Sequence, residues 1–419
     1  MLMNATLKLP EGWKFVKLEE VTEILDSKRI PLDSEFRKNI QGSFPYCGAT
    51  GIIDYIDNWI FDGEYVLVAE DGGKFFRFET TAYLMKGKFW ANNHVHIMKG
   101  KSEFLNNEFL SYFINFEDIS SYISGSTREK LNQKLLRNIV IPLPPLPEQQ
   151  KIAEILETVD NCLEKTQQLI EKYKRIKQGL MEELLTKGID ENGNIRSEET
   201  HRFKDSPLGR IPEEWEVVRL ENEVYLNPDT LKYEKNKTIF YIDIESIIEG
   251  QITSIKIYKT ENAPSRARRL VKTQDIIVST VRPNLKAFAY IKPKYNEYIC
   301  STGFAVLRAK NRLFSEFLFC LVLYDDIFLK QISKFITGSN YPAVNPSELL
   351  KIIIPLPPLS EQQRIAEILS QIDEVIEKEE KYKEKLERLK KGLMEDLLSG
   401  KIRVNHFISE EKELQDEKN

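Results

Sequence analysis

The chain has 419 residues and a mass of 48.9 kDa, more than the roughly 100–200 residues of one domain, which predicts two or three domains. Hydrophobic residues make up 41% of it and aromatic residues 10%, which excludes a wholly disordered chain. Lys and Arg number 60 against 65 Asp and Glu. This balance excludes a protein that binds nucleic acid through a uniformly basic surface, although it does not exclude local basic patches.

The cysteines and the N-terminal residues bear on the compartment. The four cysteines lie far apart and form no Cys-x-x-Cys pair, so neither a disulfide framework nor a zinc site is predicted. The N-terminal residues lack the apolar core of a signal peptide, and no stretch reaches the ~20 apolar residues of a membrane span. We therefore expect a cytoplasmic protein with no membrane association.

The first half of the chain is expected to be a mixed α/β domain. Residues 64–78 and 90–100 predict strands around glycine turns. Glu70 and Asp71 could form an acidic pair, but the following glycines favour a turn. His94 and His96 could bind a metal in principle, although two ordinary strand residues explain them equally simply.

Motifs for catalysis are missing from both halves. Residues 100–102 (GKS) end like a phosphate-binding loop, but Val95 stands where the leading glycine is required. The Asn-Pro-Pro-aromatic motif of amino-methyltransferases does not occur, since Asn227-Pro228 continues into Asp229. We therefore predict no catalytic residue, no metal site and no cofactor site in this chain.

The most informative pattern is an internal repeat. Residues 141–156 (IPLPPLPEQQKIAEIL) return at 354–369 as IPLPPLSEQQRIAEIL, a register of 213 that continues through 178–185 and 391–398. A weaker repeat opens each half, where Trp13 matches Trp215.

Each repeated segment predicts an extended proline stretch followed by a long helix. Prolines bar a helix before Pro147, which is tolerated at a first helical position, and Ser360 with Gln363 forms a capping-box pattern. Apolar positions then recur every three or four residues, as in a coiled-coil face over about 40 residues, or roughly 60 Å. These positions are Ile152, Leu156, Val159, Leu163, Ile170, Tyr173, Ile176, Leu180 and Leu184, and Ile365, Leu369, Ile372, Ile376, Leu386, Leu389, Leu393 and Leu397.

The segment after the first helix is polar and rich in turn residues, which indicates a linker. Parallel packing of the helices would require its 23 residues to span nearly the whole helix length, so antiparallel packing is favoured. The expected organisation is a first domain at 1–146, a helix at 147–187, the linker at 188–210, a second domain at 211–359, a second helix at 360–400 and a polar tail at 401–419.

The second half carries a strong local positive charge. Strands are expected within residues 275–284 and 298–310. Between Lys256 and Lys294 there are ten basic residues against Glu261 and Asp275, a net charge of +8. This excess is typical of phosphate binding, while a solvated strand edge protected by lysines is the alternative.

The duplicated PLPPL-x-EQQ-x-IAEIL segment resembles the specificity subunit of type I restriction-modification systems. Further stretches over most of the chain look like that family: residues 46–57, 68–73, 92–97, 300–307 and 338–349. The resemblance implies an α/β fold in which two target-recognition domains are separated by two long antiparallel coiled-coil helices in a pseudo-twofold repeat.

The family also implies a function. Each domain would read one half of a split double-stranded DNA target, and the helices would dock two methyltransferase subunits and, through them, restriction subunits with motor activity. S-adenosylmethionine, ATP and magnesium would belong to those partners.

The residues expected to contact DNA are basic and amide side chains of the two halves, together with one tyrosine. They are Lys74, Arg77, Lys86, Asn92, Asn93 and Arg128 in the first domain and Arg266, Arg268, Arg269, Arg282, Asn284, Lys286, Asn340 and Tyr341 in the second. Two other functions are weighed against this hypothesis. A non-DNA coiled-coil scaffold explains the helices but not the local positive charge, and a standalone methyltransferase or nuclease needs a motif that the sequence lacks.

Overall fold

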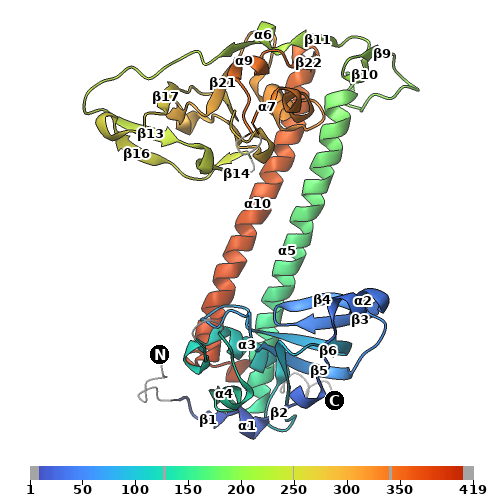
Figure 1. Cartoon of the computed structure of the whole chain (residues 1–419), viewed down its shortest axis with the longest axis vertical. Helices are drawn as coiled ribbons and strands as arrows, with labels where there is room; N and C mark the ends of the chain where they lie inside the picture. Colours follow the sequence, from blue (N-terminus) through green and yellow to red (C-terminus); the bar gives the residue numbers. More distant parts are fainter. Residues whose placement is uncertain (1–8, 126–128, 249, 339–341, 409–419) are drawn as a thin grey trace. The chain divides into compact units, whose positions relative to one another are not determined.

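The computed structural model describes residues 9–125, 129–248, 250–338 and 342–408 (Figure 1). It divides into two compact units. Unit 1 comprises Met1–Gln168 with Glu380–Asn419, and unit 2 comprises Leu169–Glu379. Both boundaries fall inside the long helices, so each unit contains one part of each helix.

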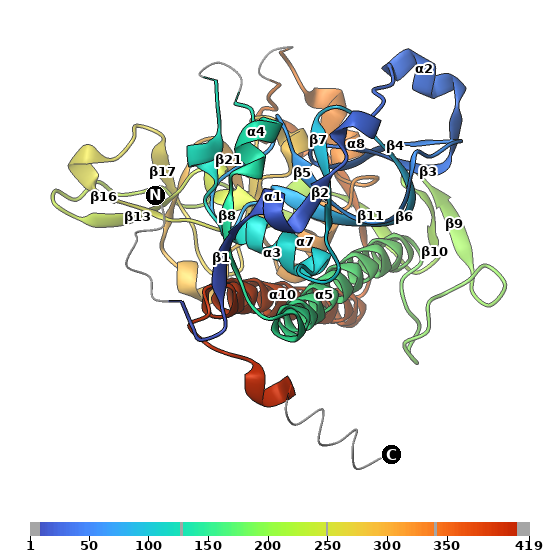
Figure 2. The same ribbon diagram turned by 90° about the horizontal axis from the view of Figure 1, so that it is seen from below.

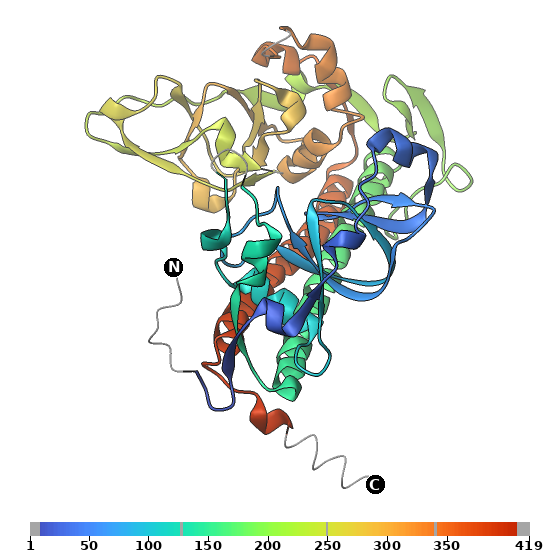
Figure 3. The ribbon, with the colours of Figure 1, turned by 60° about the horizontal axis from the view of Figure 1, so that its bottom comes forward.

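Unit 1 is built around one six-stranded sheet in the order β2-β7-β5-β6-β3-β4, coloured blue to cyan in Figure 3. Helix α3 packs on β5 and β6 (Figure 2), and its buried Phe109 and Phe113 join the core of the unit. The elements are β1 (Lys14–Lys17), α1 (Leu18–Val21), β2 (Thr22–Ile24), α2 (Ser34–Asn39), β3 (Gln41–Gly48), β4 (Gly51–Ile56), β5 (Phe61–Ala69), β6 (Ala82–Ala91), β7 (Val95–Gly100), α3 (Asn107–Phe116), α4 (Gln133–Arg137) and β8 (Val140–Leu143).

Unit 2 has two four-stranded sheets, in the orders β12-β21-β18-β19 and β16-β13-β20-β17. Its elements are β9 (Phe203–Ser206), β10 (Gly209–Pro212), β11 (Glu216–Arg219), α6 (Leu220–Glu223), β12 (Val224–Leu226), β13 (Thr238–Ile242), β14 (Ile247–Ile248), β15 (Gln251–Ile252), β16 (Lys256–Lys259), β17 (Ala267–Leu270), β18 (Ile276–Ser279), β19 (Phe288–Tyr290), β20 (Ile299–Ser301), β21 (Phe304–Ala309), α7 (Ser315–Leu323), α8 (Leu329–Ile332), α9 (Pro346–Leu349) and β22 (Ile353–Leu356).

The two units share a strand plan although their sequences differ. The order β2-β7-β5-β6 in unit 1 corresponds to β12-β21-β18-β19 in unit 2. In unit 1, Tyr46 of β3 pairs in parallel with Trp90 of β6, and in unit 2 Tyr241 of β13 pairs in parallel with Ile299 of β20. The predicted α/β class with an internal repeat is therefore confirmed.

One predicted strand is wrong. Strand β5 ends at Ala69, and residues 74–78 form no strand. Gly72 and Phe78 both have positive φ, of 68° and 64°, so the backbone turns away from an extended course there.

The prediction of a long helix in each repeated segment is confirmed, but both helices begin one residue earlier than expected, so Pro147 is the second residue of its helix. Helix α5 spans Leu146–Thr186 and helix α10 spans Leu359–Leu398. Because α10 begins one residue before Ser360, this serine lies inside the helix and does not act as the expected N-cap. Instead the carbonyl oxygens of Pro145 and Pro358 accept the first helical N–H bonds.

The helices run antiparallel within each unit. In unit 1 Lys390 bonds to Asp160 at 2.5 Å and Lys383 to Gln167 at 3.0 Å. The residue numbers of the partners therefore fall along α10 as they rise along α5. In unit 2 the apolar cluster joins residues 181–185 of α5 to residues 365–369 of α10.

A buried glutamate at the start of each long helix ties three chain segments together. In unit 1, Glu148 accepts a bond from Trp13 Nε1 at 3.0 Å and two from Arg403, from Nε at 2.6 Å and from Nη2 at 2.8 Å. In unit 2, Glu361 accepts from Trp215 Nε1 at 3.1 Å and from both terminal nitrogens of Arg196. We call these the unit 1 lock and the unit 2 lock.

The arginine of each lock follows the other long helix. Arg196 lies beyond the end of α5 and binds the start of α10, and Arg403 lies beyond the end of α10 and binds the start of α5. Gly188 lets the chain leave α5 at a φ of +65°, where a Cβ atom would come within 2.4 Å of the Trp215 ring. Each lock therefore holds both helices of its unit.

The residue after each glutamate is a fully buried glutamine. Gln149 accepts from the Asn106 N–H and donates to the carbonyls of Phe104 and Pro144. Gln362 makes the matching three bonds, accepting from the Phe314 N–H and donating to the carbonyls of Arg312 and Pro357. The repeated Glu-Gln of the sequence is thus a structural motif that anchors each helix to its unit.

Glu361→Ala should destabilise unit 2 by about 3 kcal/mol or more, because it leaves the buried Arg196 guanidinium without its carboxylate. Urea unfolding of the full chain, followed by tryptophan fluorescence, measures the loss. The matched control is Glu367→Ala, an exposed position on the same helix that should change stability by no more than about 0.5 kcal/mol. Equal midpoints for the two variants would contradict the lock.

Candidate nucleic-acid interface

Three segments of unit 1 meet where β5 ends, and we call them the unit 1 turn cluster. They are the turn after β5 (residues 70–74), the turn between β6 and β7 (residues 92–94) and the segment around Lys130. The Glu70 N–H donates to the His94 carbonyl at 2.9 Å, and the Leu131 N–H donates to the Glu70 carbonyl at 2.8 Å.

Unit 2 repeats this arrangement with other residues, and we call it the unit 2 turn cluster. The Thr280 N–H donates to the Gly303 carbonyl at 2.8 Å, and the Val344 N–H donates to the Thr280 carbonyl at 2.9 Å. A bridge between Val281 and Ala343 matches that between Asp71 and Lys130 in unit 1. Two unlike sequences therefore present the same backbone frame.

Charged side chains connect the segments of the unit 1 turn cluster. Glu70 bonds to Arg29 at 2.6 Å and to Lys130 at 2.8 Å, and Asp26 lies 2.6 Å from Nδ1 of the buried His96. The Nε2 atom of His96 lies 2.6 Å from the Leu131 carbonyl. Through His96, the network therefore connects β7 to the segment around Asp26 and to the segment around Leu131.

The electrostatics keep both carboxyl groups of this network ionised. Burial alone would raise the pKa of Asp26, but the bond to His96 and the Ile97 N–H hold it below its ordinary value. The pKa of Glu70 is likewise lowered against the effect of burial, by the bonds to Lys130 and Arg29.

The unit 2 turn cluster presents a basic and amide surface. Arg282 and Lys286 adopt left-handed backbone conformations on either side of a short 3-10 turn, and Asn284 within that turn is exposed. The Arg282 N–H donates to the Pro342 carbonyl at 2.7 Å, and Lys286 bonds to Asp325 at 2.6 Å.

Not all of the residues predicted for the first domain belong to the unit 1 turn cluster. Lys74, Asn92 and Asn93 lie in its turns, and Asn92 is buried, with its side-chain oxygen accepting the His94 N–H. Arg77 lies close by, with its guanidinium stacked 4.4 Å from the centre of the Phe116 ring. Lys86 lies elsewhere, bonded to Glu108 at 2.6 Å, and Arg128 is outside the described residues.

The predicted residues of the second domain divide in the same way. Arg266 and Arg268 are exposed next to the turn of residues 301–303, where the Thr302 N–H donates to the Arg266 carbonyl at 2.8 Å. Arg269 points into the unit and donates to Asn227 and to the Phe304 carbonyl, and burial lowers its pKa. Arg282, Asn284 and Lys286 lie in the unit 2 turn cluster, whereas Asn340 and Tyr341 are outside the described residues.

The structure adds two lysines that the sequence pattern did not single out. A groove of about 230 Å³ in unit 2 lies between α5 and Lys286 and is lined by Lys174, Lys177, Gln178, Met181, Gly250, Lys286 and Leu323. In the sequence, Lys174 and Lys177 lie in a charged stretch that is typical of a solvent-exposed helix face, and no local pattern links them to Lys286.

The two histidines considered as metal ligands, His94 and His96, each have a separate carboxylate partner. His94 contacts Asp71, and His96 contacts Asp26 and a carbonyl oxygen. Within the four described ranges, no group of three or more His, Cys, Asp or Glu side chains is placed to hold a metal ion. Over the same residues, no helix is both long enough and apolar enough to cross a membrane.

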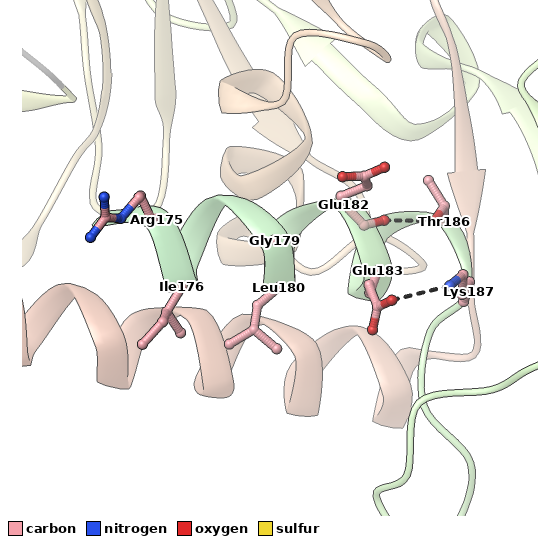
Figure 4. A pocket seen from close by; sticks show the side chains of 8 residues that line it. All are labelled: Arg175, Ile176, Gly179, Leu180, Glu182, Glu183, Thr186 and Lys187. Carbon is pink, nitrogen blue, oxygen red and sulfur yellow. Dashed lines mark hydrogen bonds and ion pairs between the residues drawn. The ribbon is translucent and has the colours of Figure 1, made fainter. Parts of the chain in front are cut away.

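A second surface lies along the part of α5 in unit 2 (Figure 4). A groove of about 430 Å³ is lined by Arg175, Ile176, Gly179, Leu180, Glu182, Glu183, Thr186 and Lys187, and the side chains of Ile176 and Leu180 point to the same side. Ile176 was expected in the buried seam of the helices, yet the residue is 40% exposed. At the matching position of α10 in unit 1, Leu389 is 51% exposed, so both seams depart from the prediction at equivalent residues.

The comparisons with known proteins agree with this architecture. The sequence matches the family described as the type I restriction modification DNA specificity domain over residues 10–175 and 212–388. It is 28% identical to the MjaVIII type I specificity subunit of Methanocaldococcus jannaschii, covering 96% of this chain and 95% of the relative. It is 31% identical to the putative MjaX specificity subunit of the same organism, covering 74% and 75%.

A solved structure supports the fold. The S subunit of a type I restriction-modification system from M. genitalium superposes with a TM-score of 0.61 at 16% identity, covering 95% of this chain and 98% of that one. The family match spans well over half of the sequence and falls on both units. The chain therefore belongs to the family of specificity subunits of type I restriction-modification systems.

Proposed function

We propose that this chain recognises a bipartite double-stranded DNA target, with one half read by the unit 1 turn cluster and the other by the unit 2 turn cluster. The observation that carries the proposal is the duplicated backbone frame with different side chains on it. Two copies of one frame can face two DNA segments in the same way, while different side chains select different bases.

Phosphate contacts would hold each unit on the DNA. Arg266 and Arg268 are exposed beside the unit 2 turn cluster, and Lys174 and Lys177 line the groove that reaches Lys286. Such cations attract DNA without regard to sequence and orient the readers, whereas base edges carry the specificity. The length of α5 and α10 would set the spacing of the two half-sites.

The exposed helix faces would dock the methyltransferase subunits, one at Ile176 and one at Leu389. A partly apolar groove bordered by charged side chains fits a helix of a partner protein. Because the two faces come from the internal repeat, they would accept two copies of the same subunit. Restriction subunits would join through the methyltransferases.

The chemistry would reside in those partners, so that the chain itself acts as a non-catalytic recognition subunit. S-adenosylmethionine, ATP and magnesium would be bound by the partner subunits, and the assembly would work in the cytoplasm, where the DNA lies. A coiled-coil scaffold that does not bind DNA is the alternative. A salt-dependent mobility shift of duplex DNA, measured with the methyltransferase partner present, separates the two functions.

Replacing Arg266 and Arg268 together by alanine should weaken binding and flatten its salt dependence. Each lost phosphate contact removes about 0.9 from the slope of log affinity against log salt concentration, so a reduction of about 1.8 is expected. Arg210→Ala, at an exposed arginine of the β9–β10 hairpin, is the control. An unchanged slope in the double variant would remove these arginines from the interface.

Ile176→Lys or Leu389→Lys should each reduce the number of bound methyltransferase subunits from two to one, and the double variant should bind none. A lysine at the centre of an apolar contact must be desolvated on docking, whereas in the free chain the exposed site tolerates it. Light scattering of the assembled complex measures the stoichiometry, with the exposed Lys385→Ala as control. Two bound copies on the double variant would place the docking surface elsewhere.

A further inference from the structure

One side-chain pair of the unit 1 turn cluster is partly exposed and has no counterpart in unit 2. The His94 Nδ1 atom lies 2.6 Å from Asp71 Oδ1. The imidazole side chain is 42% exposed and the carboxylate 10% exposed. The His94 ring therefore reaches solvent, whereas its partner Asp71 is largely covered.

This contact fixes which nitrogen of His94 carries a proton. An ionised carboxylate can only accept a hydrogen bond, so Nδ1 must be the donor in the pair. In the neutral ring Nε2 is then a hydrogen-bond acceptor. Among the described residues no hydrogen bond to Nε2 is made, which leaves this atom available to a ligand.

The backbone around the pair is held at both ends. The His94 N–H donates to the Asn92 side chain at 2.8 Å, and the His94 carbonyl accepts the Glu70 N–H at 2.9 Å. Glu70 directly precedes Asp71 and is bonded to Arg29, and His96 follows two residues after His94 and is bonded to Asp26. A side chain on such a fixed frame can present one atom to a ligand at a defined position.

The corresponding positions of unit 2 have a different chemistry. Gly303 occupies the place of His94 in the backbone frame, and Val281 occupies the place of Asp71. Neither residue offers a polar side-chain atom. The histidine-aspartate pair therefore distinguishes unit 1 from unit 2, as a specificity-determining group would.

We propose that His94 reads a base edge in the half-site bound by unit 1. Its Nε2 atom accepts a hydrogen bond from the exocyclic amino group of an adenine or a cytosine in the major groove. Both bases present an N–H₂ donor there, whereas guanine and thymine present only acceptors or a methyl group. Asp71 is a positioning residue that holds the acceptor form of the ring toward the DNA. This inference rests on the function proposed above and names one residue of its specificity.

The test maps adenine methylation in cells that express the full chain with its methyltransferase partner. His94→Phe keeps a planar ring and removes both nitrogens. We expect one position in one half-site to lose its requirement for adenine or cytosine, with a loss of discrimination no larger than the roughly 5- to 150-fold that a bidentate base contact provides. The other half-site should be unchanged.

Asp71→Asn provides the second variant. An amide can donate as well as accept, so both tautomers of His94 become available and the base preference should broaden at that same position. A purely structural role of Asp71 would lower the melting temperature without changing one base of the target. Lys99→Ala, at an exposed lysine near the other end of β7, is the matched control and should leave the target intact.

The outcomes separate this inference from the proposed function. If the wild-type chain gives no bipartite methylated target, the proposed function fails. If the wild-type target is bipartite but both variants leave it unchanged, or alter only the half-site that responds to Asn284→Ala in unit 2, then His94 is not a reader. If the melting curve of His94→Phe shows that this variant does not fold, the methylated target of Asp71→Asn decides whether His94 is a reader.

Discussion

The structure depends on one buried carboxylate at the beginning of each long helix. A glutamate at a helix N-terminus benefits from the helix dipole, but burial of its charge is costly unless it is fully paired. Glu148 and Glu361 meet this requirement with an indole N–H and an arginine each. Each carboxylate therefore joins three segments of its unit at a single point: the residue before β1 or β11, the start of one long helix and the chain beyond the end of the other long helix.

The turn clusters show how one frame can carry different specificities. The hydrogen bonds that join the turns come from backbone atoms, as in the pairs from Glu70 to His94 and from Thr280 to Gly303, so they do not restrict most side chains. Unit 1 uses the frame for a histidine-aspartate pair, and unit 2 uses it for arginine, asparagine and lysine. Specificity can change at such positions with little consequence for the core.

The parts of the fold that repeat in sequence could be predicted, and those that repeat only in structure could not. The prolines and the three/four spacing locate α5 and α10 within a residue or two. The shared strand plan was not visible because it depends on backbone pairing, as between Tyr46 and Trp90, which unlike sequences satisfy equally well. The expected strand through Phe78 failed because a paired Asp71 and a left-handed Gly72 redirect the chain.

The candidate site was predicted in part for a similar reason. Local charge identified Arg266, Arg268 and the turn around Asn284, but charge alone cannot distinguish an exposed arginine from Arg269, which satisfies internal acceptors. His94 was weighed only as a metal ligand, since its partner Asp71 lies 23 residues away and only the fold brings the two together.

The unit 1 lock has a consequence for biosynthesis. Arg403 is translated 255 residues after the Glu148 that it binds, whereas every member of the unit 2 lock lies between residues 196 and 361. During synthesis, the unit 2 lock can therefore form before the C-terminal segment that completes the unit 1 lock has been translated. A polypeptide released before residue 403 would retain an interior anion with no cation beside it, at a cost in stability that the complete chain does not incur.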